Sequence, residues 1–252
     1  MSKFVDKLQS LLESSAAPIG FRASALESKS PTMLLVARLS GMEVKEARIA
    51  VDANADAGLI LSEGSSVKNL KQIMETLGDV PLGVFVKGLS EEKIAELTSL
   101  GCDFVVFDIK ARATILQSEK VGRFLMIEPS LEQGFVRAIN GLEVDGVFIS
   151  SRADDPFVAV EHLLICRRLV ELLEKPAIMV LPSLVVKAEL TSLWQAGIDG
   201  IVAPSAQSAE ALIHLRKMIN ELPKRRKSRH TKASAILPQY RLPASEEDEG
   251  ED

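Results

Sequence analysis

The sequence predicts an α/β protein: a single closed (βα)8 TIM barrel with an N-terminal helical extension and a disordered C-terminal tail. Eight short apolar runs, separated by stretches with helical periodicity, fill residues 32–223. Each run is apolar almost throughout, as expected of a parallel strand buried on both faces. Strands and helices that alternate without a hairpin signal favour closure into a barrel. The main alternative, an open doubly wound sheet, is disfavoured because no GxGxxG motif follows the first strand.

The eight predicted strands form two alternating groups. The first group consists of DAGLILSEG, CDFVVFDIK, VDGVFISSR and IDGIVAPSA, which start at Asp56, Cys102, Val144 and Ile198. These segments recur at intervals of about 42 to 54 residues, a spacing that fits two βα units. The second group lies between them, at residues 32–41, 80–88, 122–130 and 176–183.

Local signals mark where several helices begin. Ser90 precedes the periodic segment EEKIAELTSL and is placed to cap a helix. Ser208 stands in the same position before AEALIHLRKMINEL. In the sixth connection, Asp154 or Asp155 is expected to cap a helix whose first turn contains Pro156.

The N-terminal extension, residues 1–31, does not fit the repeat. It begins with the amphipathic segment FVDKLQSLLE. We expect this helix to close the lower mouth of the barrel or to lie along its side. In either position it would bury Phe4, Leu8, Leu11 and Leu12.

The C-terminal tail, residues 224–252, has charges sorted by sign. A basic block at residues 224–232 precedes an acidic block at residues 246–252, and the only apolar island between them is ILPQYRLP. A segment of this composition buries too little surface to offset its ordering entropy, so we expect it to be disordered. It is either a solubilising tail or a contact segment. As a contact segment, its basic block would touch an anionic partner such as nucleic acid, and its apolar island would dock as a short linear motif.

Composition and charge exclude several classes of protein. The 252 residues are 46% apolar and 26% charged, which is typical of a globular chain and excludes a disordered or fibrous protein. No run approaches the roughly 18 apolar residues of a membrane span, and the first residues do not read as a signal peptide. We therefore expect a cytoplasmic protein with no membrane partner. Residues 1–223 hold 23 basic and 29 acidic residues, a net charge of −6, which disfavours nucleic-acid binding by the barrel.

Cysteine and histidine positions narrow the chemistry further. Cys102 and Cys166 lie far apart, with no CxxC motif and no histidine at ligand spacing, so we expect two buried thiols. No histidine stands at a predicted strand end, which disfavours a histidine acid–base pair or a histidine-ligated metal. We predict no metal site, although Mg²⁺ held by Asp108 and Glu128 remains open. The sequence identifies no cofactor.

The candidate site lies at the carboxyl ends of the strands, because eight loops converge there in barrel enzymes. Each predicted strand ends in at least one polar residue. The candidate catalytic residues are Lys87, Asp108, Lys110 and Glu128. The candidate residues for binding a substrate or an anion are Arg38, Ser62, Glu63, Ser150, Ser151, Arg152, Ser183 and Ser205.

Strand alternation groups the candidate catalytic residues. In FVVFDIK, Asp108 and Lys110 share one face, about 6 to 7 Å apart along the strand. If this face points inward, both side chains enter the mouth, and Lys87 and Glu128 approach from the neighbouring strands. One lysine would serve as an acid, a base or a Schiff-base nucleophile while the other holds an anion. A purely structural ion-pair network at the barrel mouth is an equal alternative.

A resemblance to a known family rests on two segments near the end of the barrel. LPSL at residues 181–184 and IDGIVAPSA at residues 198–206, followed by a helix, resemble the phosphate-binding (ribulose-phosphate-binding-like) barrels. The resemblance implies that the loops after the seventh and eighth strands and a helix N-terminus hold a phosphate. The chain departs from the family pattern because Pro182 and Pro204 stand where the family usually has glycines, and proline removes a backbone donor.

Two functions remain open at this point. The first is a lyase, aldolase or isomerase acting on a small anionic metabolite, such as a phosphorylated one, through the cluster of lysines and carboxylates. The second is a non-catalytic barrel that binds or assembles with partners through its tail. We favour the enzyme, because charged residues converge at the strand ends. The sequence is compatible with a homo-oligomer but does not predict one.

Overall fold

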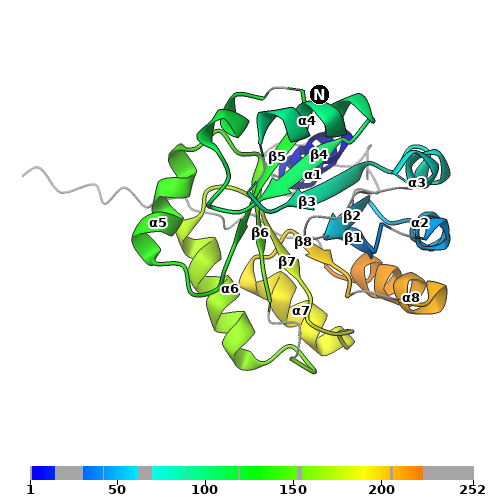
Figure 1. Cartoon of the computed structure of the whole chain (residues 1–252). Helices are drawn as coiled ribbons and strands as arrows, with labels where there is room; N and C mark the ends of the chain where they lie inside the picture. The colour runs from blue at the N-terminus through cyan, green and yellow to red at the C-terminus, as the bar shows by residue number, and fades with distance from the viewer. Residues whose placement is uncertain are drawn as a thin grey trace, which may run out of the picture.

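Eight parallel strands close into a barrel in the order of the sequence, with helices around it (Figure 1). The computed structural model describes residues 2–14, 31–41, 43–61, 70–88, 90–118, 120–151, 155–204 and 207–223. The closed barrel confirms the predicted fold class. The predicted tail, residues 224–252, lies outside the described residues.

Each strand falls within one of the eight predicted runs. The strands are β1 (Leu34–Leu39), β2 (Ala57–Leu61), β3 (Leu82–Val86), β4 (Phe104–Phe107), β5 (Gly122–Ile127), β6 (Gly146–Ile149), β7 (Ala177–Val180) and β8 (Gly200–Val202). The barrel closes where Leu34 of β1 pairs with Gly200 of β8. Almost all strand residues are buried, since helices cover the outside of the barrel and side chains fill its inside.

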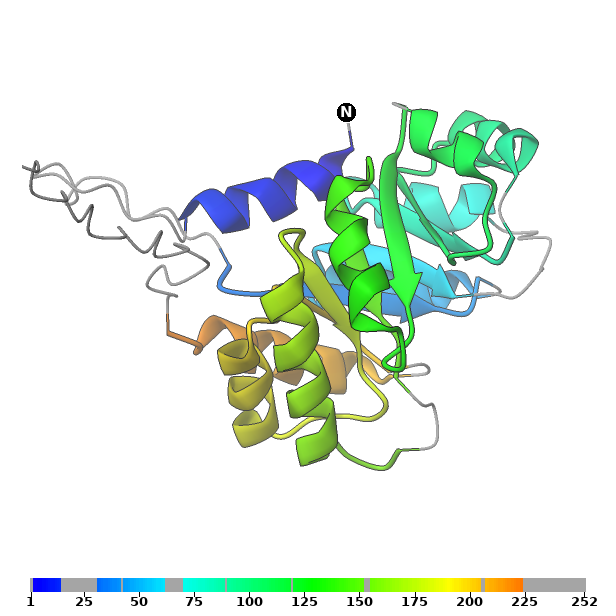
Figure 2. The ribbon, with the colours of Figure 1, turned by 90° about the vertical axis from the view of Figure 1, so that its left-hand side faces the viewer.

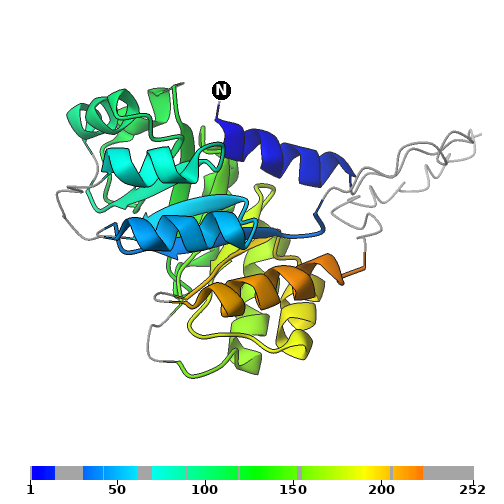
Figure 3. The same cartoon turned by 90° about the vertical axis from the view of Figure 1, so that its right-hand side faces the viewer.

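Seven α-helices surround the described barrel and one more crosses its base. They are α1 (Lys3–Ser14), α2 (Val44–Asp52), α3 (Leu70–Leu77), α4 (Glu91–Ser99), α5 (Gln133–Ala138), α6 (Val160–Leu172), α7 (Lys187–Ala196) and α8 (Ala209–Asn220). Helices α2, α3 and α8 lie side by side on one flank (Figure 3). None of these described helices is long and apolar enough to cross a membrane.

The fourth βα unit differs from the prediction of a helix after every strand. Here the 3-10 helix η1 (Ala113–Gln117) takes the place of an α-helix. The connection is short, because β4 ends at Phe107 and β5 begins at Gly122. A second 3-10 turn, η2 (Ile139–Gly141), extends the short helix α5.

The helix starts predicted at Ser90 and Ser208 are confirmed. The hydroxyl of Ser90 accepts a hydrogen bond from the amide of Lys93 (3.5 Å), and Ser208 caps α8 in the same way. The predicted cap of the sixth helix is wrong, since α6 starts at Val160, after the Asp-Pro segment. Here the amide of Ala159 donates to Nδ1 of His162 (3.0 Å), so an imidazole within the helix serves the N-terminal amide.

Four phenylalanines pack inside the barrel. The rings of Phe4, Phe104, Phe124 and Phe148 are fully buried, with centroids 4.5 to 6.4 Å apart among the contacting pairs. Gly83 leaves room for the Phe104 ring on the neighbouring strand. A Cβ atom added to Gly83 would lie 2.1 Å from that ring. The large ring on β4 thus packs against a position of β3 that has no side chain.

Helix α1 closes the lower mouth, which is the first of its two expected positions. Its residue Phe4 stacks on Phe104 with a centroid distance of 4.5 Å, and Leu8 and Leu11 are buried in the same interior cluster. Leu12 is partly buried against that cluster. In Figures 2 and 3 this helix, coloured dark blue, runs across one end of the barrel. The opposite, upper mouth is where the carboxyl ends of the strands lie.

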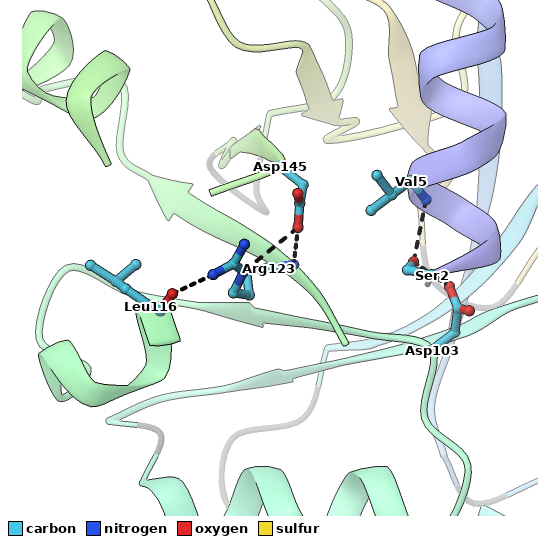
Figure 4. Close-up of polar contacts among 6 residues, drawn as sticks. All are labelled: Ser2, Val5, Asp103, Leu116, Arg123 and Asp145. Atoms are coloured by element: carbon cyan, nitrogen blue, oxygen red, sulfur yellow. Dashed lines mark hydrogen bonds and ion pairs between the residues drawn. The ribbon is translucent and has the colours of Figure 1, made fainter. Parts of the chain in front are cut away.

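The aspartate that repeats before every second strand has a structural role. Asp56, Asp145 and Asp199 each accept a hydrogen bond from a backbone amide of the preceding strand. The donors are, in the same order, Leu35 (2.8 Å), Arg123 (2.7 Å) and Ala177 (2.9 Å). Figure 4 shows the pair formed by Arg123 and Asp145. The repeated aspartate therefore links the beginnings of neighbouring strands, at the end of the barrel away from the candidate site.

Candidate functional site

The upper mouth has an apolar floor. Leu61, Phe85 and Met126 point to the inside of the barrel, where they pack on the buried interior cluster while remaining partly exposed. The candidate residues predicted from the sequence do not include these three. Their signal was present in the strand alternation, because each stands two positions after an inward-facing residue of its strand.

Lys87 and Asp108 lie side by side at the mouth. Val86 of β3 pairs with Phe107 of β4, so the residues that follow them, Lys87 and Asp108, come next in register. The amide of Gly88 points to Oδ1 of Asp108 at 3.5 Å. Two members of the predicted cluster therefore stand at adjacent strand ends, while the cluster itself stays a prediction.

Lys110 lies on a turn and not on the strand. The chain leaves β4 after Phe107, and Asp108 accepts hydrogen bonds from the amides of Lys110 (3.1 Å, on Oδ1) and Ala111 (3.1 Å, on the carbonyl oxygen). The expectation that Lys110 continues the strand and shares its face with Asp108 is therefore wrong. A carboxylate that binds the amide two residues ahead bends the backbone, which the apolar alternation of FVVFDIK does not reveal.

Glu128 stands at the next strand end, beside Ser150. Ile127 of β5 pairs with Ile149 of β6, so Glu128 and Ser150 follow in register. Ser150 directs both its amide (2.9 Å) and its hydroxyl (3.1 Å) to the carbonyl oxygen of Ile127. Glu128 is exposed and accepts a long hydrogen bond from Ser130 (3.4 Å). Asp108 is in register with Met126 of β5. Glu128 therefore lies two residues beyond Asp108 in the direction in which the strands run.

Arg38 is the inward-facing cation at the end of β1. It follows Leu34 and Val36, which belong to the interior cluster, at the same strand spacing. Partial burial lowers the pKa of its guanidinium. Within the described part of the chain, no carboxylate forms an ion pair with it. Arg216, an arginine whose side chain is 11% exposed, instead pairs with Asp56 at 2.6 Å.

A shallow depression adjoins Arg38 on the outer side of β1. It is lined by apolar side chains of β1, α2 and α8 together with Arg38, Glu46 and Gln207. The Glu46 carboxylate is held by the amide (2.6 Å) and the hydroxyl (2.7 Å) of Ser40. No sequence signal singled out Glu46 or Gln207, because a polar residue near a helix start is common at any surface.

The remaining anion-binding candidates divide into described and undescribed residues. Ser183, after β7, has a buried hydroxyl oxygen without a hydrogen-bond partner among the described residues. Ser151 is partly buried after β6. The candidates that lie outside the described residues are Ser62, Glu63, Arg152 and Ser205.

The described residues contain no group of three His, Cys, Asp or Glu side chains arranged to hold a metal ion. The carboxylates closest to this chemistry, Asp108 and Glu128, are separated along the mouth by the register of β4 and β5. Within the described residues, no third His, Cys, Asp or Glu side chain joins either carboxylate in such a group.

Comparisons with known proteins find the same fold in several solved structures. A mutant tryptophan synthase α-subunit from Pyrococcus furiosus is 14% identical, with a TM-score of 0.60 over 76% of this chain and 98% of its own. Phosphoribosyl anthranilate isomerase from Thermus thermophilus is 12% identical, with a TM-score of 0.58 over 74% of this chain and 98% of its own. A protein from Aquifex aeolicus VF5 is 14% identical, with a TM-score of 0.58 over 88% of this chain and 98% of its own.

These matches, at 12 to 14% identity, agree with the predicted resemblance at the level of the barrel fold. No family model matches the sequence, and no curated protein is similar enough in sequence to match.

Proposed function

We propose that the protein is a barrel enzyme of lyase or isomerase type that acts on a small anionic metabolite in the upper mouth. The observation that carries the proposal is Arg38, a half-buried guanidinium that faces inward and has no anionic partner in the described part of the chain. A desolvated cation is unfavourable on its own and gains from a bound anion. The tryptophan synthase subunit and the isomerase that share the fold support an enzyme.

Each group at the mouth has a role in this proposal. Arg38 holds the anionic group of the substrate, and the apolar floor below it excludes water. Lys87 is the reactive amine, and its neighbour Asp108 accepts or returns the proton. Lys110 and Glu128 bind polar groups of the substrate at the rim. The candidate serines, including the unpartnered Ser183, donate hydrogen bonds to its oxygens.

Binding of inorganic phosphate tests the role of Arg38. Isothermal titration should show binding to the wild-type protein and a loss of at least about tenfold in affinity for Arg38→Met. Arg137→Met removes an exposed arginine from the outer helix α5 and is the matched control, which should bind as the wild type does. Equal binding by all three proteins would contradict an anion site at Arg38.

Trapping with borohydride tests the role of Lys87. The amine would condense with a carbonyl metabolite and release water, and borohydride would reduce the imine to a stable secondary amine. Mass spectrometry should then find the adduct on Lys87 and lose it in Lys87→Met. An adduct on Lys110 would show that the reactive amine is Lys110, in the turn after β4, and not Lys87. No adduct across a broad panel of carbonyl metabolites would exclude Schiff-base chemistry.

A second candidate function, a non-catalytic binding barrel, is favoured by one observation. The Asp108 carboxylate is already engaged by the amides of Gly88 and Lys110, as in a residue that shapes a loop. A binding barrel would lose phosphate affinity in Arg38→Met and yet give no adduct and no turnover. A cytoplasmic location, and contact with nucleic acid through residues 224–232, remain predictions.

A further inference from the structure

Arg38 belongs to a layer of otherwise apolar side chains inside the barrel. The interior of such a barrel is filled by layers of four side chains, which alternate strands contribute. The strand pairings, together with the tilt of the strands, bring inward residues of β1, β3, β5 and β7 to one level. The uppermost layer of this kind within the strands consists of Arg38, Phe85, Met126 and Val180. One guanidinium therefore shares its layer with three apolar side chains.

The groups proposed to react stand one layer higher. Lys87 follows Phe85 by two positions, and Glu128 follows Met126 by two positions. Two residues of a strand span about 6 to 7 Å. A ligand held by Arg38 therefore lies against the apolar layer, below the ends of β3 and β5.

The helix N-termini at the mouth are poorly suited to a phosphate. Glu189 lies in the first turn of α7, where its carboxylate accepts a hydrogen bond from the amide of Val186 (2.8 Å). Glu210 lies in the first turn of α8. Pro182 and Pro204, which follow β7 and β8, supply no backbone N–H. A dianion placed at either helix would meet a carboxylate and would lack a backbone donor.

We propose that Arg38 binds a carboxylate, and that the substrate is a monocarboxylic acid with an apolar carbon chain; this inference rests on the function proposed for the upper mouth. A guanidinium presents two parallel N–H donors, which match the two oxygens of a carboxylate. A carboxylate carries one negative charge, and the layer holds one cation. A phosphate ester carries about two negative charges at pH 7, and the second has no counterpart in this layer. The carbon chain packs on Phe85, Met126 and Val180.

Two ligands with the same carbon chain and different head groups test the carboxylate. Isothermal titration of the full chain at pH 7 should give an affinity for hexanoate at least about tenfold higher than for hexyl phosphate. Inorganic phosphate binds the same guanidinium more weakly than hexanoate, because it gains nothing from the apolar layer. If hexyl phosphate binds at least as tightly as hexanoate, and Arg38→Met weakens both, the carboxylate is wrong and the proposed anion site stands. If Arg38→Met weakens neither, the proposed anion site fails as well.

Replacing arginine by lysine tests how the head group is held. Arg38→Lys keeps the positive charge and loses the planar pair of donors, so the affinity for hexanoate should fall by about tenfold. Arg137→Lys makes the same change on the outer helix α5 and should bind hexanoate as the wild type does. Wild-type affinity in Arg38→Lys would show that charge alone holds the ligand, and would overturn the paired hydrogen bonds to a carboxylate.

A series of acids tests the apolar layer. Acetate, butyrate and hexanoate should bind the wild-type protein progressively more tightly, by roughly two- to fourfold for each buried methylene. Phe85→Ala should flatten this increase and leave the affinity for acetate within about threefold of the wild type. Phe135→Ala removes an exposed ring of α5 and is the control, which should keep the full increase. The series on the wild-type protein decides even if Phe85→Ala is unstable, because equal affinities for the three acids would contradict an apolar chain in this layer.

Discussion

The Asp103 carboxylate accepts a hydrogen bond from the amide of Phe4 (3.0 Å), which fastens α1 across the base of the barrel. The Ser2 hydroxyl (2.7 Å) and the Lys3 amide (2.8 Å) donate to the same carboxylate (Figure 4 shows Ser2 and Asp103). Asp103 belongs to the repeat in which the other three aspartates bind a preceding strand. Here the carboxylate caps the N-terminus of α1 instead, so the repeat has been adapted to seal the lower mouth.

Replacing Asp103 should loosen α1 and destabilise the barrel. Asp103→Ala removes the acceptor for amides of the first turn and should lower the free energy of unfolding by about 2 kcal/mol, as measured by urea denaturation. Asp79→Ala, which removes only the exposed partner of Lys3, is the control and should leave stability unchanged. Equal stability of both variants would show that the Phe4 ring alone holds the helix.

Filling the space above Gly83 should be costly. In Gly83→Ala the new Cβ would lie 2.1 Å from the buried ring of Phe104, so the aromatic cluster has to shift. Overpacking of this kind should lower the free energy of unfolding by about 1 to 3 kcal/mol or prevent folding. Gly134→Ala is the control, because a Cβ atom there meets nothing within 4 Å and the residue lies in α5. Its stability should be unchanged or slightly raised. A Gly83→Ala protein of wild-type stability would contradict the tight packing of this cluster.

The fold could be predicted from the sequence because its signals are local and repeated. Buried parallel strands are apolar almost throughout, and Ser90 and Ser208 have the side chains that cap helices. The features that were predicted wrongly depend on contacts that no local sequence pattern shows. At α6 a histidine takes over the cap from Asp155, and the Asp155 carboxylate contacts the other nitrogen of that ring at 3.1 Å. The connection after β4 is short and holds the 3-10 helix η1 in place of an α-helix.

The two thiols should make the barrel sensitive to alkali. Burial raises the pKa of Cys102 and of Cys166 from 9.0 to about 12. Well below pH 9 both thiols are protonated in the folded and unfolded states, so neither changes stability with pH. Between pH 9 and 12 the unfolded chain ionises first, so each thiol lowers the free energy of unfolding by up to about 1.4 kcal/mol per pH unit.

Urea denaturation between pH 8 and 10.5 would measure this loss. A Cys102→Ala/Cys166→Ala double variant should have a shallower decline with pH than the wild type, although it starts from a lower stability because of the lost packing. The buried thiols should also resist a thiol reagent at pH 8 until the protein is unfolded. Parallel pH profiles of the two proteins would show that the thiols do not titrate as their burial requires.

Two buried arginines should respond in opposite ways to the same substitution. Arg216→Met breaks the ion pair with Asp56, whose side chain is 15% exposed, and should cost about 3 kcal/mol in the free energy of unfolding. Arg38→Met removes a half-buried cation that has no ion-pair partner in the described chain, so stability should be unchanged or slightly raised. Thermal and urea unfolding of both variants make the comparison. A large loss of stability in Arg38→Met would assign Arg38 a structural role.

The candidate site could be predicted only in part. The inward direction of Arg38 and the pairing of Lys87 with Asp108 follow from strand alternation and register, which apolar patterning reveals. The place of Lys110 does not follow, because it depends on a turn made by the Asp108 side chain itself. Side-chain hydrogen bonds of this kind compete with the extended strand and leave no periodic trace in the sequence.

Asp108 should reveal whether its carboxylate shapes the turn or holds a charge network. Asp108→Asn keeps an Oδ1 acceptor for the amides of Gly88 and Lys110, so it should lower the free energy of unfolding by less than about 0.5 kcal/mol. Asp108→Ala removes the acceptor and should cost about 1 kcal/mol, as measured by urea denaturation. Asparagine would then leave the turn intact while removing the carboxylate that we propose exchanges a proton with Lys87. Losses of equal size in the two variants would show that the negative charge, not the hydrogen bonds, stabilises the mouth, and would favour a structural ion-pair network over a proton-transfer role.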